Sequence, residues 1–402
     1  MGKTSVVGVG AKLRGVKYAV VATCSGLVVA ALLTNFLWAS AYRTLLSKRP
    51  QSSSKSVYES NKSIQLPLEE NSPLLQWQEM APAPVDRLDG AALQIGDLFY
   101  VFAGYQTIDQ VHSHVDVYNL SSNQWGDRFD MPQDMAHSHL GMVSDGRYIY
   151  VVTGQYGPQC RGPTAKNFVL DTQTKKWSEL PPLPKPRYAP ATQLWRGRLH
   201  VMGGSKEDRW EPGLEHWSIA VSTGKALETA WKPEVPIPRG GPHRACVVVE
   251  DRLYVIGGQE GDFKAKPGSP IFKCSRQREV VFGDVYMLGG DAKEWKTLPS
   301  MPKPDSHIEF AWAVVNQSIF IVGGTTEKNP VTKRMVLVGE VFEFNLKTLK
   351  WRIVGKMPYR VKTTLVAFWN GWLYFTSGQR DKGPADPSPK KVVRRTWRTK
   401  LS

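Results

Sequence analysis

The chain has 402 residues, of which 41% are hydrophobic and 22% charged, and this is the composition of a folded protein. Its formal net charge is +16, but residues 1–60 carry +7 and residues 380–402 carry +6. The body between these ends is therefore close to neutral, which argues against a nucleic-acid partner.

The first recognisable segment is residues 18–38, which run without a formal charge from Tyr18 to Trp38. At about 1.5 Å per residue, a helix of this length spans the ~30 Å hydrocarbon core of a membrane. A cleaved signal peptide is the alternative, since Ala39 to Ala41 offer a cleavage site, but its apolar region usually has only ~7–15 residues. We therefore predict one transmembrane helix, a signal anchor, preceded by a short basic cytosolic tail at residues 1–17.

Residues 39–73 follow and are rich in Ser, Lys, Gln and Asn, a composition that predicts a flexible, disordered stalk. Basic residues flank the predicted helix equally on both sides, so they do not decide its orientation. Asn-x-Ser glycosylation sequons begin at Asn61, Asn119 and Asn316. They favour a glycoprotein of type II topology, with residues 74–402 in the lumen of the secretory pathway.

A repeat of about 50 residues occupies residues 74–402. Its clearest copy is Asp251 to Gly258 (DRLYVIGG), in which a charged turn leads into alternating β-formers that end at two glycines. The last glycines of six such copies fall at 104, 154, 204, 258, 324 and 378. A period of this size is typical of β-propeller blades.

A series of tryptophans confirms the register of the repeat, because each stands shortly before a Pro-rich turn: Trp77, Trp125, Trp177, Trp231, Trp295 and Trp351. Each repeat is predicted to form four short strands, a to d. Strand b ends at the glycines, strand c carries patterns such as Val115 to Asn119 (VDVYN), and strand d carries the Trp, which fills the gap between blades.

The double-glycine strand, the aromatic-bearing strand c and the spaced Trp resemble the kelch repeat of the galactose oxidase/kelch superfamily. The resemblance is strongest where Gly257-Gly258 and Gly323-Gly324 are intact, and it implies an all-β propeller, here with six blades. The chain also resembles plant membrane-anchored kelch-repeat proteins, and this resemblance implies a location in the Golgi apparatus.

The two ends of the repeat region complement each other. Residues 74–78 read as a strand d without a, b or c before it, and residues 392–397 read as a strand c without d after it. Pairing them completes the sixth blade and removes two exposed sheet edges. We expect the ring to close in this way.

No specific catalytic signature occurs in the sequence. The copper site of galactose-oxidase-like enzymes and the Glu-x3-Asp-x3-His iron motif of nitrile-specifier-like kelch proteins have no matching residues here. His112-Ser-His114 and His137-Ser-His139 could bind zinc, but no cysteine or supporting carboxylate is placed with them. We therefore predict no cofactor and no metal.

Polar residues recur at the predicted start of strand a, the innermost strand. Counting 15 or 17 residues back from each closing glycine predicts that the mouth of the central channel carries Arg87, Asp89, His137, His139, Arg187, His243, His307 and Glu309, with Arg239 and Arg360 nearby. These side chains either hold loops and water, or bind a sugar, a uronic acid or another anion. We take Arg87, Asp89, Arg187, Arg239, His307 and Arg360 as ligand-binding candidates.

The b–c connection of the fourth repeat, from Gln259 to about Val281, is longer than the others and rich in Lys and Arg. It should overhang the channel mouth, because b–c and d–a connections leave a propeller on the same side. It is either a functional loop or a tolerated insertion. Cys274 in it and Cys160 on the same side could form a disulfide in a lumen, with Cys246 left over.

These observations predict a membrane-anchored kelch propeller that acts as a protein- or glycan-binding module or scaffold, rather than an enzyme. The alternative is a carbohydrate-active enzyme, an epimerase or oxidoreductase, with His137, His139, His243 and Glu309 as acid/base candidates. The enzyme needs an acid/base pair that converges on one ligand, whereas a scaffold needs only a dispersed polar rim.

Overall fold

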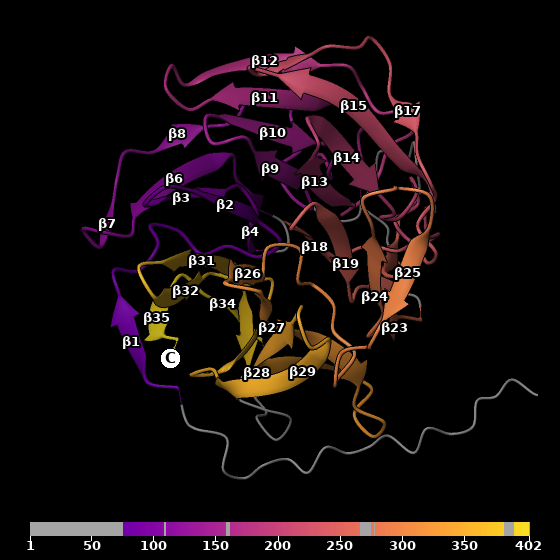
Figure 1. Cartoon of the computed structure of the whole chain (residues 1–402). Coiled ribbons are helices and arrows are strands. Elements are labelled where there is room, and N and C mark those ends of the chain that lie inside the picture. The colour runs from indigo at the N-terminus through magenta and orange to yellow at the C-terminus, as the bar shows by residue number, and fades with distance from the viewer. Residues whose placement is uncertain are drawn as a thin grey trace, which may run out of the picture. The chain divides into compact units, whose positions relative to one another are not determined.

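The computed structural model describes residues 75–107, 110–157, 161–265, 275–276, 278–381 and 390–401. These residues form strands, turns and loops, and no helix occurs among them. Six sheets surround one axis, with the innermost strand of each sheet next to that axis (Figure 1).

Each sheet is one blade, and its strands a to d run from the inside to the outside. Blades 1 to 3 consist of β2 (Ala91–Ile95), β3 (Leu98–Phe102), β6 (His114–Asn119), β7 (Gln124–Trp125) and β8 (Phe129–Asp130); β9 (Gly141–Ser144), β10 (Tyr148–Val152), β11 (Asn167–Asp171) and β12 (Lys176–Leu180); and β13 (Ala191–Trp195), β14 (Arg198–Met202), β15 (His216–Ser222), β16 (Lys225–Ala226) and β17 (Lys232–Pro233).

Blades 4 to 6 consist of β18 (Ala245–Val249), β19 (Arg252–Ile256), β24 (Val285–Leu288) and β25 (Trp295–Leu298); β26 (Trp312–Val315), β27 (Ser318–Lys328), β28 (Met335–Asn345) and β29 (Lys350–Lys356); and β31 (Leu365–Trp369), β32 (Trp372–Thr376), β35 (Thr396–Lys400) and β1 (Trp77–Met80). All pairings within the blades are antiparallel.

Short hairpins extend the b–c connections: β4 (Tyr105–Thr107) with β5 (Gln110–Val111), β20 (Gln259–Glu260) with β23 (Val280–Val281), β21 (Phe263–Lys264) with β22 (Ser275–Arg276), and β33 (Gln379–Asp381) with β34 (Lys391–Val392). Strand β30 (Arg360–Lys362), in the d–a connection before blade 6, pairs with the other side of β33. Because strands alternate in direction, the b–c and d–a connections share one face of the ring, which we call the loop face. The a–b and c–d turns lie on the opposite face, the turn face.

The glycines that end strand b lie where neighbouring blades crowd together. Gly257 has a φ of 64°, and a Cβ built on it would lie 2.4 Å from the carbonyl oxygen of Asp305. A side chain at this position would therefore collide with the backbone of the next blade, and glycine also tolerates the positive φ. The double-glycine signal of the sequence thus reflects a close approach between blades.

The tryptophans of the outer strands link each blade to the one before it. In five of them the indole Nε1 donates to a carbonyl at the end of the preceding blade's outer strand: Trp77 to Lys356, Trp125 to Ala81, Trp231 to Pro181, Trp295 to Val235 and Trp351 to Pro299. The Nε1 of Trp177 is buried without such a partner. The indoles therefore join neighbouring blades by hydrogen bonds as well as by packing.

The first and last strands that the structure describes lie side by side in blade 6 (Figure 1). Trp77 of β1 stands opposite Thr399 of β35, and the paired strands begin three and four residues later than the expected 74–78 and 392–397. The shift has a local reason. Strand β32 pairs with β35 from Thr376 opposite Thr396 onwards, and residues 391–392 pair with β33 in the hairpin above the blade.

The predicted fold class needs one correction. The described part of the chain is an all-β propeller, but it contains no helix long and apolar enough to cross a membrane. The segment expected to do so, residues 18–38, lies outside the described residues, as do the expected cytosolic tail and stalk. The expectation of a transmembrane helix before the propeller is therefore withdrawn.

Candidate functional site

One residue of each blade stands at the axis, shortly before strand a, in the left-handed region of φ. These six residues have φ between 45° and 67° and are Asp89, His139, Ala189, His243, His307 and Thr363. In blade 2, Ser138 bridges Gln155, 17 residues later, whereas in blade 5 Ser306 bridges Thr325, 19 residues later. Blade 5 thus has two extra residues, so that His307 rather than Glu309 occupies the axial row.

Although Glu309 is not in the axial row, its side chain reaches the axis from the turn that contains the two extra residues. Glu309 lies in the turn between His307 and β26, and its Oε1 contacts Nδ1 of His243 from the neighbouring blade. On the other side, Nε2 of His243 lies 3.6 Å from Oδ2 of Asp262. Burial lowers the pKa of His243, but the two carboxylates outweigh burial and raise that pKa to about 9. His243 is therefore a buried cation at neutral pH.

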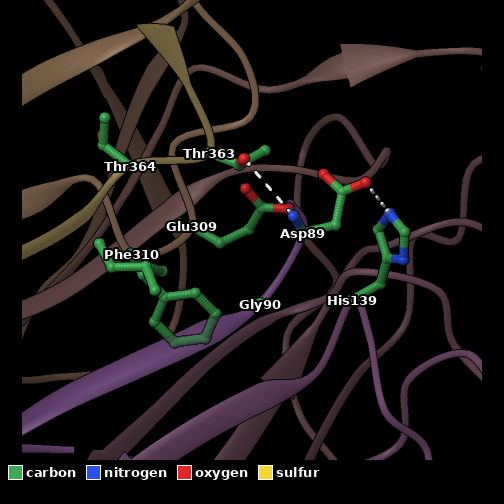
Figure 2. Close-up of a pocket in the computed structure, with 8 residues that line it drawn as sticks. Asp89, Gly90, His139, Glu309, Phe310, Thr363 and Thr364 are labelled. Carbon is green, nitrogen blue, oxygen red and sulfur yellow. Dashed lines mark hydrogen bonds and ion pairs between the residues drawn. The ribbon is translucent and has the colours of Figure 1, made fainter. Parts of the chain in front are cut away.

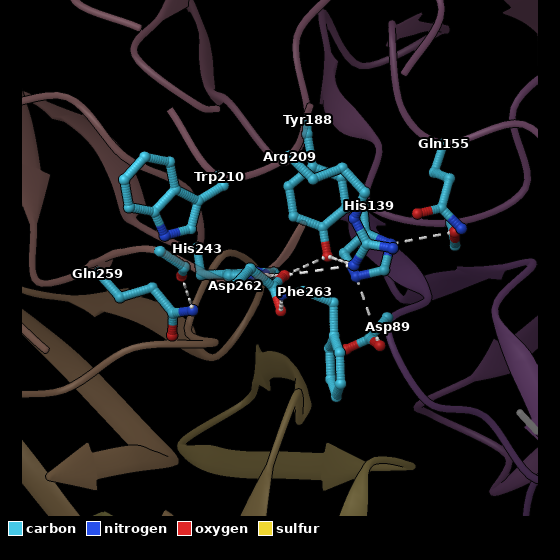
Figure 3. Close-up of polar contacts among 12 residues, drawn as sticks. Asp89, His139, Gln155, Tyr188, Arg209, Trp210, His243, Gln259, Asp262 and Phe263 are labelled. Carbon is cyan, nitrogen blue, oxygen red and sulfur yellow. Dashed lines mark hydrogen bonds and ion pairs between the residues drawn. The ribbon is translucent and has the colours of Figure 1, made fainter. Parts of the chain in front are cut away.

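Asp262 also takes part in a second set of contacts, with Tyr188 and Arg209 (Figure 3). The Tyr188 hydroxyl donates to Asp262 Oδ2 at 2.8 Å, and Arg209 Nη2 donates to the same hydroxyl at 2.7 Å. The Arg209 guanidinium lies 4.3 Å from the centre of the Tyr188 ring. Burial raises the pKa of Asp262, but Arg209 and His243 keep it well below its usual range, so this carboxylate stays ionised.

The remaining axial histidines are neutral. The His307 ring stacks on His243 with 4.0 Å between centroids, and burial next to that cation holds the pKa of His307 well below its usual value. Burial also lowers the pKa of His139, whose Nε2 lies 3.4 Å from Oδ2 of Asp89. Although burial raises the pKa of Asp89, the contact with His139 brings it down to about 2.

A small pocket opens beside this axial cluster, lined by Asp89, Gly90, His139, Glu309, Phe310, Thr363, Thr364 and Leu365 (Figure 2). It has space for about one water molecule. The Oδ1 of Asp89 is buried in the structure without a hydrogen-bond partner. An ordered water can therefore bind here, whereas a sugar ring does not fit the pocket in this conformation.

The structure brings only part of the predicted site together. Asp89, His139, His243, His307 and Glu309 converge at the axis, as described above. The others lie apart: Arg87 contacts Asp116 and Arg187 contacts Glu215 inside the blades, Arg239 pairs with Asp284 at 2.8 Å, His137 contacts the carbonyl of Pro132 at 3.1 Å, and Arg360 lies in β30 opposite Asp381.

The two buried arginines show why the counting rule selected too many residues. Arg87 and Arg187 stand two positions before the axial row, and their guanidinium groups turn outwards to carboxylates near the start of strand c. Arg187 also lies over the Trp217 ring, 4.6 Å from its centroid. These arginines stabilise the blades and are not available to a ligand at the channel mouth.

Sequence reasoning missed three members of the axial cluster, namely Tyr188, Arg209 and Asp262. Tyr188 directly precedes the axial position of blade 3, while Arg209 and Asp262 come from the b–c connections of blades 3 and 4. These connections differ in length from blade to blade, so counting from the glycines cannot align them. The only signal was the length of the blade 4 connection.

The b–c connections of blades 3, 4 and 5 contact one another on the loop face. The Ala265 amide donates to the Asp208 carbonyl at 2.8 Å, and Lys264 lies 5.0 Å from the centre of the Trp210 ring. Lys328 of blade 5 pairs with Glu279 of blade 4 at 3.2 Å. The long blade 4 connection is thus a pair of short hairpins held between its neighbours.

Exposed apolar side chains gather on the same face. Of the six large hydrophobic residues that are exposed within the described ranges, four lie in b–c connections of successive blades: Tyr156, Leu214, Val280 and Val331. The other two, Leu227 and Leu349, lie in c–d connections on the turn face. The loop face therefore carries more of these exposed apolar side chains than the turn face.

The cysteines and sequons are only partly covered by the structure. Cys246 is buried in β18, and burial raises the pKa of its thiol, while Cys160, Cys274 and Asn61 lie outside the described residues. Asn119 Nδ2 donates to Asp97 Oδ2 at 3.3 Å, so this amide is engaged. Asn316 is exposed in the turn between β26 and β27. Of the two described asparagines, Asn316 is the more accessible to a glycosyltransferase.

Comparison with known proteins gives consistent matches. The model of the KLHDC2/KLHL20/DRC7 Kelch-repeats domain matches residues 89–324. The Kelch repeat-containing protein At3g27220 of Arabidopsis thaliana is 66% identical over 82% of this chain and 77% of its own length. Kelch-like protein 23 of Homo sapiens is 21% identical over 69% of this chain, a match that covers 43% of the human protein.

A solved structure shows the same fold. The structure of YjhT superposes with a TM-score of 0.60 at 15% identity, covering 79% of this chain and 95% of that one. At this identity the likeness concerns the fold alone.

Proposed function

Because the chain belongs to the kelch-repeat family, we propose that it is a binding module that holds a partner protein on its loop face. The resemblance predicted from the glycine and Trp series is thereby confirmed. Kelch-repeat proteins generally serve as protein-interaction scaffolds, and this chain matches several of them, including Kelch-like protein 23.

The observation that carries the proposal is the arrangement of the loop face. The blade 4 connection is joined to that of blade 3 by a backbone hydrogen bond and to that of blade 5 by an ion pair, and the three connections expose Leu214, Val280 and Val331. Apolar side chains on a rigid surface are typical of protein interfaces, since little conformational entropy is lost when a partner binds. The charged groups of the axial cluster contact one another, and the pocket beside them accepts a water rather than a sugar.

Site-specific photocrosslinking tests the proposal. A photoreactive phenylalanine analogue at Leu214 or Val331 probes the loop face, and the same analogue at Leu227 or Leu349 is the matched control on the turn face. We expect one partner protein to be crosslinked from both loop-face positions and from neither control. Equal crosslinking from the two faces, or adducts that differ between Leu214 and Val331, would contradict a single binding face.

A second candidate function is a carbohydrate-active enzyme, an epimerase or oxidoreductase. It is favoured by the convergence of His139, His243 and Glu309, with a charged histidine between two carboxylates. Binding on a glycan array, followed by turnover assays of Glu309→Gln and His243→Ala, tests it. Loss of turnover with binding retained supports the enzyme. Glycan binding without turnover in the unmodified protein supports a glycan-binding module.

A location in the lumen of the secretory pathway, such as the Golgi, remains a proposal that rests on the sequons. Exposed Asn316 is the position where we expect a glycan first, with less modification of Asn119 because its amide is hydrogen-bonded. Treatment of the expressed protein with a glycosidase should shift its mobility, and Asn316→Gln should reduce that shift. An unchanged mobility would contradict the luminal location.

A further inference from the structure

The tip of the β27–β28 hairpin stands out on the loop face because it presents an apolar side chain in a fixed geometry. Val331 is 86% exposed, the highest value among the exposed large hydrophobic residues of the described chain. The turn that carries it is closed by hydrogen bonds: Asn329 Oδ1 accepts from the amides of Val331 and Thr332, both at 2.9 Å, and the Asn329 amide donates to the Arg334 carbonyl at 2.9 Å. Val331 is therefore held out towards solvent by the turn.

Exposed cations lie in this turn and on the segments of blades 4 and 6 that contact the hairpin. Lys333 and Arg334 lie in the same turn as Val331 and are exposed. Lys328 pairs with Glu279 of blade 4, so the exposed Arg278 next to Glu279 lies beside the hairpin.

Blade 6 adds a further cation from the other side. Lys390 donates to the carbonyl of Met335 at 2.9 Å, and exposed Lys391 follows it. We call Arg278, Val331, Lys333, Arg334 and Lys391 the tip patch.

The charge balance of the tip patch defines the chemistry of what binds it. Four exposed cations stand against two exposed carboxylates in the described parts of these connections, Glu327 in the hairpin and Glu260 in β20 opposite Val280, because Glu279 already pairs with Lys328. The body of the chain is nearly neutral, so this is a local excess of positive charge. A partner with carboxylates around one apolar side chain complements both the cations and Val331.

We propose that the tip patch docks an acidic segment of a partner protein, a segment in which Asp and Glu residues flank one apolar side chain. This inference rests on the proposed function and names where on the loop face the partner binds and by which chemistry. An acidic segment suits the patch better than a membrane, because only one apolar residue is offered. It also suits the patch better than nucleic acid, because no aromatic side chain belongs to the patch for bases to stack on.

A binding assay with acidic peptides tests the proposal on the full chain. The probes are fluorescein-labelled peptides of Asp and Glu around a single Leu or Phe, and counterparts with Asn and Gln in place of the acids. We expect saturable binding of acidic peptides only, weakened by added salt because exposed charges are screened. Lys333→Glu/Arg334→Glu should weaken binding at least about tenfold, and Val331→Ser should weaken it about threefold without changing the salt dependence.

Blade 5 supplies its own matched control. Its c–d turn on the turn face carries Lys347, Leu349 and Lys350, which are exposed like the residues at the tip. Lys347→Glu/Lys350→Glu makes the same charge change on the same blade and should alter binding less than about twofold. Equal weakening by both double variants would show diffuse attraction to the whole protein and would overturn the proposal, as would the absence of binding to every acidic peptide.

Two further arms separate this inference from the proposed function. Stronger binding to vesicles with anionic lipids, or to RNA, than to acidic peptides would overturn the acidic-segment proposal. If photocrosslinking identifies a loop-face partner whose binding is unchanged by Lys333→Glu/Arg334→Glu, the tip patch is rejected and the binding module stands. If no partner is crosslinked to the loop face, the proposed function itself fails.

Discussion

Two buried histidine pairs of this propeller have opposite electrostatics. At the axis, His243 stacks on His307 and is charged, with a pKa raised to about 9, since carboxylates outweigh the effect of burial. Between β14 and β15, His200 Nδ1 and His216 Nε2 lie 2.8 Å apart. Burial lowers the pKa values of these two to about 3 and about 4.

The difference shows that burial by itself favours the neutral form of histidine. A buried histidine is charged where neighbouring carboxylates stabilise its protonated ring. His216 Nδ1 donates to the Val235 carbonyl at 3.0 Å, so its Nε2 accepts from His200 and the neutral pair is satisfied. At the axis, Glu309 and Asp262 flank His243 instead, and a charge becomes stable there. The axial pair, His243 and His307, therefore carries a positive charge that interacts with carboxylates, while the neutral blade 3 pair, His200 and His216, contributes to packing.

The largest expected effect comes from removing a carboxylate of the axial cluster. Asp262→Asn leaves His243 and Arg209 with less compensating charge in a buried site, and breaking such a pair costs about 3–5 kcal/mol of unfolding free energy. Urea unfolding at neutral pH measures this loss. A loss below about 1 kcal/mol would mean that solvent reaches the cluster and would remove the contrast with blade 3.

The second-largest effect on stability is expected from acid, which acts on the His200 and His216 pair of blade 3. The pKa values of His200 and His216 are lower in the folded state than the ordinary value of 6.5, so the unfolded state binds more protons as the pH falls. Their contribution to stability is complete above pH 6.5 and declines towards pH 4. Between pH 7.5 and pH 5 we expect a loss of about 2 kcal/mol for each histidine.

The double variant His200→Leu/His216→Leu isolates this acid effect. Its unfolding free energy should fall less steeply with acid than that of the unmodified protein. Equal slopes would show that other groups cause the acid dependence.

Mild alkali should lower the contribution of the axial pair to the unfolding free energy, whereas acid lowers that of the blade 3 pair, and the loss should be smaller. The folded pKa of His243 is above 6.5, so its contribution is complete below pH 6.5 and is lost as the pH rises to about 9. From pH 6.5 to pH 8 the expected loss is about 1.5 kcal/mol. Glu309→Gln should reduce this dependence, because it removes one of the two charges that favour the protonated ring. An unchanged pH profile in that variant would contradict the pairing.

The sequence predicted the repeat and its spacing because glycine and Trp perform fixed physical tasks in every blade. Gly257 allows the close approach of a neighbouring backbone, and Trp125 bonds to the blade before it. The counting rule also brought Asp89, His139 and His243 to the axis. It also predicted that His307 and Glu309 lie there, but it put Glu309 in the axial row in place of His307, since two extra residues in blade 5 shift its register.

What the sequence could not predict depends on contacts between connections of unequal length. Arg209 and Asp262 reach the axis from two such connections, and only coordinates show that they contact Tyr188. The sequence also did not predict that His243 is charged, because Glu309 and Asp262, which favour its protonated form, are far from His243 along the chain.

The pairing of β1 with β35 has a consequence for biosynthesis. Strand β1 leaves the ribosome before all other strands that the structure describes, and its partner β35 leaves last (Figure 1). The indole of Trp77 also bonds to the carbonyl of Lys356, which is made some 280 residues later. Throughout translation the edge of β1 is thus without its native neighbours, and a chaperone that shields this edge would protect the nascent chain from aggregation.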